Sequence, residues 1–176
     1  YSTNTFIKTS WNRLLKHAQQ LPPKCRILEI GCNNGDFLQL LHQALPSATI
    51  IGVDVNPSGI ASCKQRGFNC VLSSAQKLPF KSHSFDYIFS SHTFEHIPNV
   101  HHTFAEVSRV LKPQGQAFVV VPPNWFGLET IRVAMKMKSG IKWSLNKIQV
   151  ILKLCLVEEP LYLHKNYKIY TIFPYL

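Results

Sequence analysis

The stretch Ile27-Leu-Glu-Ile-Gly-Cys-Asn-Asn-Gly-Asp36 decides the fold. Its start belongs to an apolar run over residues 25–30, which predicts a short buried strand. The glycines that follow let the backbone turn tightly and come close to a ligand. A helix is predicted over residues 36–45, and the amide groups at its start can face that ligand. A strand, a glycine-rich turn and a helix in this order indicate a ligand-binding α/β unit. For this loop alone, the alternative is a tight turn without a ligand.

The alternation of strand and helix continues on both sides of this unit. Trp11, Leu14, Leu15 and Ala18 recur at helical spacing before it. After it, strands are predicted over residues 48–55, 68–72, 85–89 and 116–121, with helices after Asn56 and Asn99. Five apolar strands separated by helices imply a mainly parallel sheet that is covered on both faces. With right-handed crossovers this is a doubly wound, Rossmann-like α/β fold, which binds ligands beyond the carboxyl ends of its strands.

The length of 176 residues predicts one domain, and the hydrophobic content of 45% excludes a disordered chain. The sequence has no uninterrupted run of about 18 apolar residues, so we expect no membrane-spanning helix. We expect an N-terminal helix in residues 1–24, a ligand-binding core in 25–123, a helical cap or insertion in 124–160, and the start of a C-terminal strand region in 161–176. Within the cap, residues 145–157 are predicted to be helical, and a strand is expected within 166–173.

The net charge of +10 allows nucleic acid, an anionic membrane surface or an acidic substrate as a partner. Residues 124–176 hold 8 Lys/Arg and 3 Asp/Glu, so the C-terminal part is the more basic one. The five cysteines are odd in number and include no CxxC pair, which favours neither a disulfide framework nor a zinc ribbon. We therefore expect reduced thiols and a cytoplasmic protein.

The glycine-rich turn departs from the dinucleotide fingerprint. That fingerprint needs glycine at its first, third and sixth positions, which here hold Gly31, Asn33 and Asp36. Asp36 would also repel a pyrophosphate, so a nicotinamide dehydrogenase is disfavoured. Asp54 ends the second predicted strand, 54 − 31 = 23 residues after Gly31, where a carboxylate can accept hydrogen bonds from ribose hydroxyls. The loops therefore suit a nucleoside-like ligand without a phosphate at this turn.

Five segments, in order, resemble the class I S-adenosylmethionine-dependent methyltransferases, and in particular the large group that acts on small molecules. They lie within residues 25–123 approximately. Each segment alone is weak evidence for the resemblance, and the five together in this order are strong evidence. The segments are Ile27-Leu-Glu-Ile-Gly-Cys-Asn-Asn-Gly35, Gly52-Val-Asp-Val-Asn-Pro57, Ser74-Ala-Gln-Lys-Leu-Pro-Phe80, Ser84-Phe-Asp-Tyr-Ile-Phe-Ser-Ser-His-Thr-Phe-Glu-His-Ile97 and Glu106-Val-Ser-Arg-Val-Leu-Lys-Pro-Gln-Gly115.

The resemblance implies roles for the matching positions. Glu29 and Gly31 would line the methionine end of the cofactor, while Asp54 would hold its ribose. The implied cofactor-binding set is Glu29, Gly31, Cys32, Asn33, Gly35, Asp54, Val55, Ser74, Ala75, Gln76 and Ser90. Two of these depart from the family pattern, because Asn33 stands where glycine is commoner and Ser74 stands where the family often has aspartate.

His92 is the candidate catalytic residue. It follows the fourth predicted strand, and an imidazole titrates near neutral pH, so it could take a proton from the acceptor. The alternative is that His92 only shapes the pocket. The segment His92-Thr-Phe-Glu-His96 also matches the H-x-x-E-H zinc motif, which must lie within a helix. Here it begins at the end of a strand, so we expect no metal.

The leading functional hypothesis is an enzyme that transfers a methyl group from S-adenosylmethionine to a small or lipid-like acceptor, leaving S-adenosylhomocysteine. The first alternative is an RNA or other nucleic-acid methyltransferase, suggested by the charge. Against it, Ser90-Ser-His-Thr93 stands where base methyltransferases often carry Asn/Asp-Pro-Pro-aromatic. The second alternative is a non-enzymatic cofactor-binding module. Apolar stripes beside lysines in residues 127–157 indicate a lid that could touch anionic lipid peripherally. The oligomeric state is left open, and the C-terminal strands are expected to be incomplete.

Overall fold

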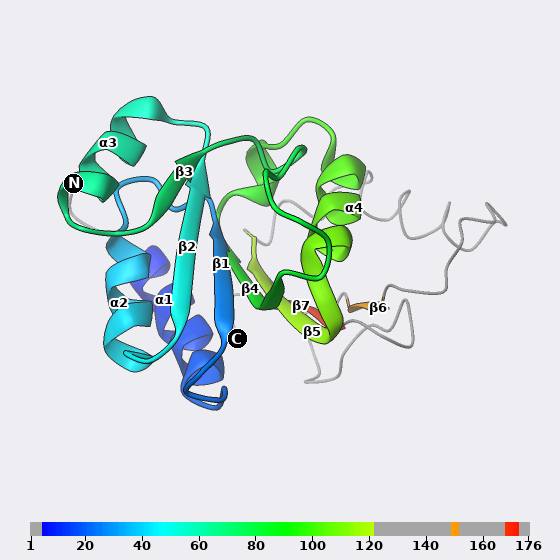
Figure 1. Cartoon of the computed structure of the whole chain (residues 1–176), viewed down its shortest axis with the longest axis horizontal. Coiled ribbons are helices and arrows are strands. Elements are labelled where there is room, and N and C mark those ends of the chain that lie inside the picture. The colour runs from blue at the N-terminus through cyan, green and yellow to red at the C-terminus, as the bar shows by residue number, and fades with distance from the viewer. Residues whose placement is uncertain (1–4, 122–148, 152–167, 173–176) are drawn as a thin grey trace, which may run out of the picture.

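The computed structural model describes residues 5–121, 149–151 and 168–172 (Figure 1). All strands join one sheet in the order β3-β2-β1-β4-β5-β7-β6, and every pairing is parallel. The helices are α1 (Thr5–Ala18), α2 (Asp36–Ala44), α3 (Pro57–Gln65), the short 3-10 helix η1 (Phe94–His96) and α4 (Val100–Val110). The strands are β1 (Arg26–Ile30), β2 (Thr49–Asp54), β3 (Cys70–Leu72), β4 (Phe85–Ser91), β5 (Leu111–Val120), β6 (Gln149–Ile151) and β7 (Lys168–Ile172). The predicted doubly wound parallel sheet is thus confirmed.

Apolar side chains project from both faces of the sheet and are buried under helices, as is usual for a parallel sheet. Leu28 and Ile30 of β1 belong to a buried cluster that includes Val107 of α4. Ile27, the residue before Leu28, belongs to a second cluster with Leu14 of α1 and residues of α2 and α3. Figure 1 shows α4 across the sheet from α1 and α2. The alternation along β1 therefore buries successive side chains under different helices, which holds the ends of the central strands in place.

The local signals at α3 are confirmed. The side chain of Asn56 accepts a hydrogen bond from the backbone N–H of Ser58 at 3.2 Å and so caps the helix, and Pro57 lies in the first turn. Gly67 has φ 83° and ends the turn beyond the helix, because this left-handed conformation favours glycine. These two signals direct the chain from β2 through α3 into β3.

β5 begins earlier than the sequence predicts. It starts at Leu111, which pairs with Phe85 of β4, and the register then shifts so that Gln116 pairs with Tyr87. Gln114 lies inside this irregular stretch with φ 68°. The turn residues 113–115 therefore form a bulge within β5 and do not mark the start of the strand.

The C-terminal strands partly correct the prediction. β7 lies within the region where a strand was expected, but Gln149–Ile151 is strand β6 rather than part of a helix over residues 145–157. A run that is apolar nearly all round cannot distinguish a buried helix from a buried strand, and β-branched Val150 and Ile151 favour the strand. The other residues of the predicted cap at 124–160 lie outside the described residues. No helix in the described part of the chain is both long and apolar enough to cross a bilayer.

The cysteines give a second correction. Cys63 of α3 and Cys70 of β3 form a disulfide, so the expectation of reduced thiols was wrong for this pair. Their Cα atoms lie 6.5 Å apart because the turn at Gly67 folds the start of β3 back along α3. Sequence spacing alone does not show this proximity. Cys25 and Cys32 are buried free thiols, and Cys155 lies outside the described residues.

Candidate active site

The residues singled out by the sequence meet at one edge of the sheet. Gly31 directly follows β1, Asp54 ends β2, and Ser90 is the last residue of β4 but one. The register pairs Ile30 with both Val53 and Ser90, so these ends lie side by side. This is the carboxyl edge at which a doubly wound sheet binds its ligands.

The loop after β1 needs three residues with positive φ. Gly31 and Gly35 both have φ 85°, and Asn33 has φ 42°. A side chain at Gly31 would collide with Thr93, because the loop after β4 packs against the Gly31 backbone. Asparagine is among the residues that tolerate a left-handed conformation best. Asn33 therefore keeps the loop shape at a position where the family more often has glycine.

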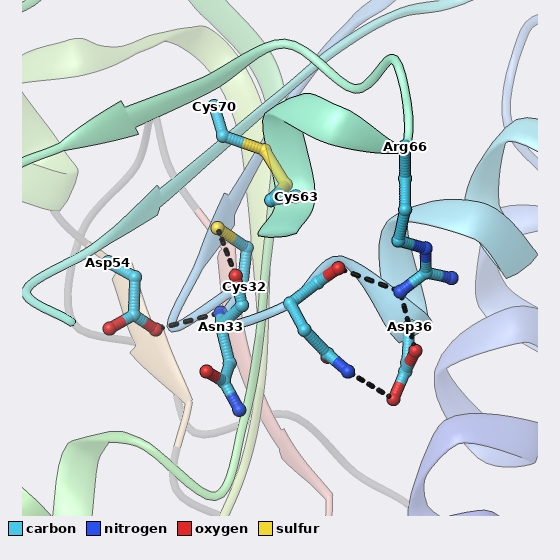
Figure 2. The surroundings of a disulfide bond; sticks show 8 residues. Cys32, Asn33, Asp36, Asp54, Cys63, Arg66 and Cys70 are labelled. Atoms are coloured by element: carbon cyan, nitrogen blue, oxygen red, sulfur yellow. Dashed lines mark hydrogen bonds and ion pairs between the residues drawn. A yellow bond between two sulfur atoms is a disulfide. The ribbon is translucent and has the colours of Figure 1, made fainter. Parts of the chain in front are cut away.

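Backbone N–H groups hold Asp54 from two sides, and Figure 2 shows the contact with Asn33. One carboxylate oxygen accepts a hydrogen bond from Asn33 N–H and the other from Asn56 N–H, each at 2.8 Å. A carboxylate has about four lone-pair sites, so two of them remain for a ligand. Asp54 thus locks the two loops together and keeps the capacity to bind hydroxyl groups.

Glu29 is a buried acid in the middle of this edge. It is 3% exposed, and its Oε2 atom has no hydrogen-bond partner among the described residues. Burial raises the pKa of Glu29 well above its ordinary value, and the nearby carboxylates Asp54 and Asp36 raise it further. A cationic ligand at this position would supply both the missing partner and the missing positive charge.

Two large apolar side chains flank Asp54 in the open. Val55, the residue after Asp54, is 68% exposed. Leu72 of β3, which pairs with Asp54 in the sheet register, is 52% exposed. Exposed apolar side chains beside a half-buried acid suit a flat ring. Beyond Leu72, Ser74 starts a turn in which its Oγ accepts from Gln76 N–H at 3.2 Å, while Ala75 is buried.

Ser90 and Thr93 connect β4 to the end of β1. Both hydroxyls donate to the carbonyl oxygen of Ile30, from Ser90 at 2.9 Å and from Thr93 at 3.3 Å. Ser90 is fully buried, so its side chain fastens the two strands rather than facing a ligand. A contribution of Ser90 to cofactor binding would come from its main chain.

His92 lies between two polar side chains. Its Nε2 atom is 2.9 Å from Oγ of Ser10 in α1, and its Nδ1 atom is 3.5 Å from Oε1 of Glu95. His92 has φ 53°, in the sparsely populated left-handed region where residues of functional sites often occur. Glu95 is 10% exposed in its side chain and its Oε2 atom lacks a partner among the described residues. The imidazole is therefore oriented from both sides.

The two histidines of the H-x-x-E-H segment differ in environment. The side chain of His96 is 78% exposed, against 15% for His92, and they do not share one helix because His92 precedes η1. Among the described residues, the only group of three or more metal-ligating side chains in close proximity is Cys32, Cys63 and Cys70. That no metal binds at His92 and His96 stays a prediction.

Two other predicted residues contribute differently from expectation (Figure 2). Cys32 is 3% exposed and its sulfur lies near Cys63 and Cys70, so only its main chain faces the loop. Asp36 forms a 2.7 Å ion pair with Arg66, which also donates to the carbonyl oxygen of Asn34. This pairing offsets the charge of Asp36 and weakens the argument that the carboxylate repels a phosphate.

Ser10, Thr93 and Glu95 were missed by reasoning from the sequence. Ser10 comes from α1, which is 82 residues before His92, and no periodicity reveals such a contact. Glu95 had a usable signal, because it stands three residues after His92. That spacing was related to a zinc motif and to the family segment ending at Ile97, and Glu95 was given no role beside His92.

The fold and this edge define a Rossmann-like protein of the class I methyltransferase fold. Residues 28–119, about half of the chain, match the family described as "Methyltransferase domain". The chain belongs to this family, that of the class I S-adenosylmethionine-dependent methyltransferases. The crystal structure of a putative S-adenosyl-L-methionine-dependent methyltransferase from Methanococcus maripaludis has the same fold. It superposes with a TM-score of 0.67 at 13% identity, over 90% of this chain and 85% of that one.

Two curated relatives are more similar in sequence. A phthiotriol/phenolphthiotriol dimycocerosates methyltransferase of Mycobacterium leprae is 40% identical over 97 residues, which is 51% of this chain and 35% of that protein. A trans-aconitate 2-methyltransferase of Escherichia coli is 30% identical over 121 residues, which is 68% of this chain and 46% of that protein. The chain thus matches less than half of the length of each relative.

Proposed function

We propose that this chain carries the cofactor site and the proton-accepting side chain of an enzyme that methylates a small or lipid-like molecule. The observation that carries the proposal is Glu29, a buried carboxyl group at the carboxyl edge with an unpartnered oxygen. A buried acid without a cation is costly to ionise, so its presence here indicates that a cationic ligand completes the site.

The described residues fit S-adenosylmethionine in three respects. Glu29 would hold the ammonium group at the methionine end, and Asp54 has lone pairs left for the ribose hydroxyls. Val55 and Leu72 would contact the adenine ring, next to the turn at Ala75. When bound, this cofactor supplies a sulfonium-activated methyl group, so that the protein mainly has to position the acceptor.

His92 would take a proton from an acceptor hydroxyl or similar group. Glu95 orients its Nδ1 atom at 3.5 Å, and Ser10 holds Nε2 at 2.9 Å. An acceptor hydroxyl would replace Ser10 as the partner of Nε2, with the proton moving to the imidazole. Glu95 would then stabilise the imidazolium by its negative charge.

The names of the relatives suggest the acceptor class. One methylates a phthiotriol or phenolphthiotriol dimycocerosate and the other trans-aconitate, by their names. Hydroxylated lipids are our first choice of acceptor, because His92 is suited to a hydroxyl that must lose its proton, whereas a carboxylate needs no base. Carboxylic acids are the second choice.

Calorimetric titration with S-adenosylhomocysteine tests the cofactor site. Wild type should bind, Glu29→Ala and Asp54→Ala should bind more weakly, and Asp86→Ala should match wild type. Asp86 is a matched control because it lies at the opposite end of β4, where it pairs with Lys112 at 2.9 Å. Absence of binding by wild type would overturn the proposal. Methyl transfer to hydroxylated lipids against tricarboxylic acids then separates the two acceptor classes.

Several further predictions concern partners and location. The peripheral membrane contact depends on residues 127–157, most of which lie outside the described residues, and the nucleic-acid alternative depends on the net charge of +10 of the whole chain. The cytoplasmic location, the oligomeric state and the non-enzymatic alternative stay open to experiment in the same way. Vesicle co-sedimentation tests the membrane contact, and salt-dependent RNA binding tests the nucleic-acid alternative.

A further inference from the structure

Three sulfur atoms meet beneath the candidate cofactor loop (Figure 2). Cys32 lies in the loop after β1, Cys63 in α3 and Cys70 at the start of β3. The three Sγ atoms are all within 4.8 Å of one another, and the side chains are 3%, 0% and 4% exposed. Cys63 and Cys70 share a disulfide, while Cys32 is a free thiol beside it.

The surroundings of the sulfurs are closed to outside reagents. All three cysteines belong to the apolar cluster between the sheet and helices α1 to α3. A side-chain carbon added at Gly52 would lie 2.6 Å from Cys32 Sγ, and one added at Gly35 would lie 3.1 Å from Cys63 Sγ. There is no space for an external thiol at this disulfide. Cys32 is the nucleophile that already lies there.

We propose that Cys32, Cys63 and Cys70 form a disulfide-exchange centre, in which the bond between Cys63 and Cys70 can pass to Cys32. The thiolate of Cys32 attacks one sulfur of the disulfide, and a new bond forms to it while the old bond breaks. The other cysteine leaves as a thiolate and takes up the proton that Cys32 lost. The step is redox-neutral, so it needs no oxidant or reductant.

The exchange would change the conformation of the loop after β1, in which Cys32 lies. That this loop binds a cofactor rests on the proposed function. Cys32 N–H donates to the carbonyl oxygen of Val53 at 3.1 Å, and its own carbonyl accepts from Gly35 N–H at 2.8 Å. The next residue, Asn33, donates to Asp54. A bond from Cys32 to α3 or β3 would shift a residue that lies between Gly31 and Asn33. The exchanged form should therefore hold the cofactor less tightly.

Charge in the surroundings restrains the exchange at neutral pH. Burial raises the pKa of Cys32 strongly, and Glu29 of β1 and Asp54 of β2 raise it further. Asp36 of α2, the other acid nearby, is paired with Arg66 beyond α3. Only the thiolate attacks, so the rate should rise about tenfold per pH unit below this pKa. The resting protein keeps the bond between Cys63 and Cys70.

Disulfide mapping of the full chain tests the exchange. Each variant is reduced in denaturant and refolded with glutathione disulfide, because the folded site is closed to this reagent. Free thiols are then trapped with N-ethylmaleimide in denaturant, and peptides are analysed without reduction. We expect Cys70→Ser to form a bond between Cys32 and Cys63, and Cys63→Ser to form one between Cys32 and Cys70. Cys25→Ser should retain the wild-type bond, because Cys25 is buried but is not one of the three clustered cysteines.

A measurement on wild type covers the case in which these variants fail to fold. Bonds from Cys32 should appear in wild type as the pH is raised from neutral to alkaline, and they should be missing from Cys32→Ser. If neither the variants nor alkaline wild type yield a bond to Cys32, the proposal is wrong.

The link to the cofactor has its own measurement. Cys70→Ser refolded with glutathione disulfide should bind S-adenosylhomocysteine at least about tenfold more weakly than the same variant refolded in the reduced state, a coupling of ordinary allosteric size. Equal affinity would overturn the link to the cofactor loop while the exchange stands. Absence of binding by the reduced protein and by wild type would instead overturn the proposed function, without affecting the disulfide map.

Discussion

Glu95 places its Oε1 atom 3.5 Å from Nδ1 of His92, three residues earlier in the chain. The carboxylate is largely buried and the imidazole faces Ser10 with its other nitrogen. A carboxylate beside Nδ1 favours the tautomer with the proton on Nδ1, in which Nε2 is the acceptor, as an acid behind a catalytic histidine does elsewhere. The relationship assigns to Glu95 the role of positioning His92.

Glu95→Gln should lower kcat with a small change in KM. The amide keeps the size of the side chain but loses the charge that stabilises the imidazolium, which should cost at least about tenfold, while His92→Asn should cost about 10²–10⁴-fold. Steady-state kinetics with the best acceptor measures both values. His101→Ala is the control, because His101 is an exposed residue at the start of α4. A KM effect alone in Glu95→Gln would show that Glu95 only shapes the pocket.

Asp54→Ala should weaken S-adenosylhomocysteine binding by about 1–3 kcal/mol. The variant loses the charged acceptor for the ribose and frees the N–H groups of Asn33 and Asn56. Asp54→Asn keeps one acceptor oxygen and should lie between wild type and Asp54→Ala. Calorimetry with Asp86→Ala as the control measures the difference. Unchanged affinity in Asp54→Ala would contradict the assignment.

Glu29→Gln should stabilise the protein without cofactor and weaken cofactor binding. The pKa of Glu29 is raised in the folded state, so the folded protein binds this proton more tightly than the unfolded chain does. The stability that Glu29 contributes is therefore largest below its ordinary pKa of 4.5 and decreases as the pH rises toward the folded pKa. The neutral amide has no such dependence, so its advantage should grow over this range.

Urea denaturation at acid and neutral pH measures that advantage, and calorimetry measures binding. Because a cationic ligand lowers the pKa of Glu29, wild-type affinity for S-adenosylmethionine should rise with pH, and that of Glu29→Gln should not. Equal pH dependence in the two proteins would place the cation elsewhere.

The sequence predicts the central elements well because their signals are local. The apolar run before Gly31, the cap at Asn56 and the turn at Gly67 each depend on residues close in the chain, and all three are confirmed. The bulge in β5 was missed because register depends on the partner strand. β6 was mistaken for helix because an apolar run of this kind has no distinguishing period.

The site shows the same division. The loop positions around Gly31 and Asp54 could be predicted, since the edge of a parallel sheet collects the strand ends. Contacts across long separations could not. Ser10 reaches His92 from α1, and Cys32 lies against Cys63 and Cys70 only because β1, α3 and β3 converge in the folded chain.

Arg109→Ala should destabilise the protein by about 1–3 kcal/mol, since it removes the cation that holds the segment after the Ala75 turn. Arg109 donates to the carbonyl oxygens of Phe80 at 2.7 Å and Leu78 at 2.9 Å, and it pairs with Glu106, which accepts Leu78 N–H at 2.7 Å. The hydrogen bond from Arg109 holds the pKa of Glu106 below its ordinary value of 4.5. The stability from this pair is thus complete above about pH 4.5 and is lost as the pH falls through the lowered pKa. The free-energy cost of Arg109→Ala, measured by urea denaturation, should therefore be smaller in acid than at neutral pH.

Lys112→Ala is the control for Arg109→Ala. It breaks a partly exposed ion pair at 2.9 Å and should cost under about 1 kcal/mol. Equal costs for the two variants would show that Arg109 does no more than an ordinary surface cation.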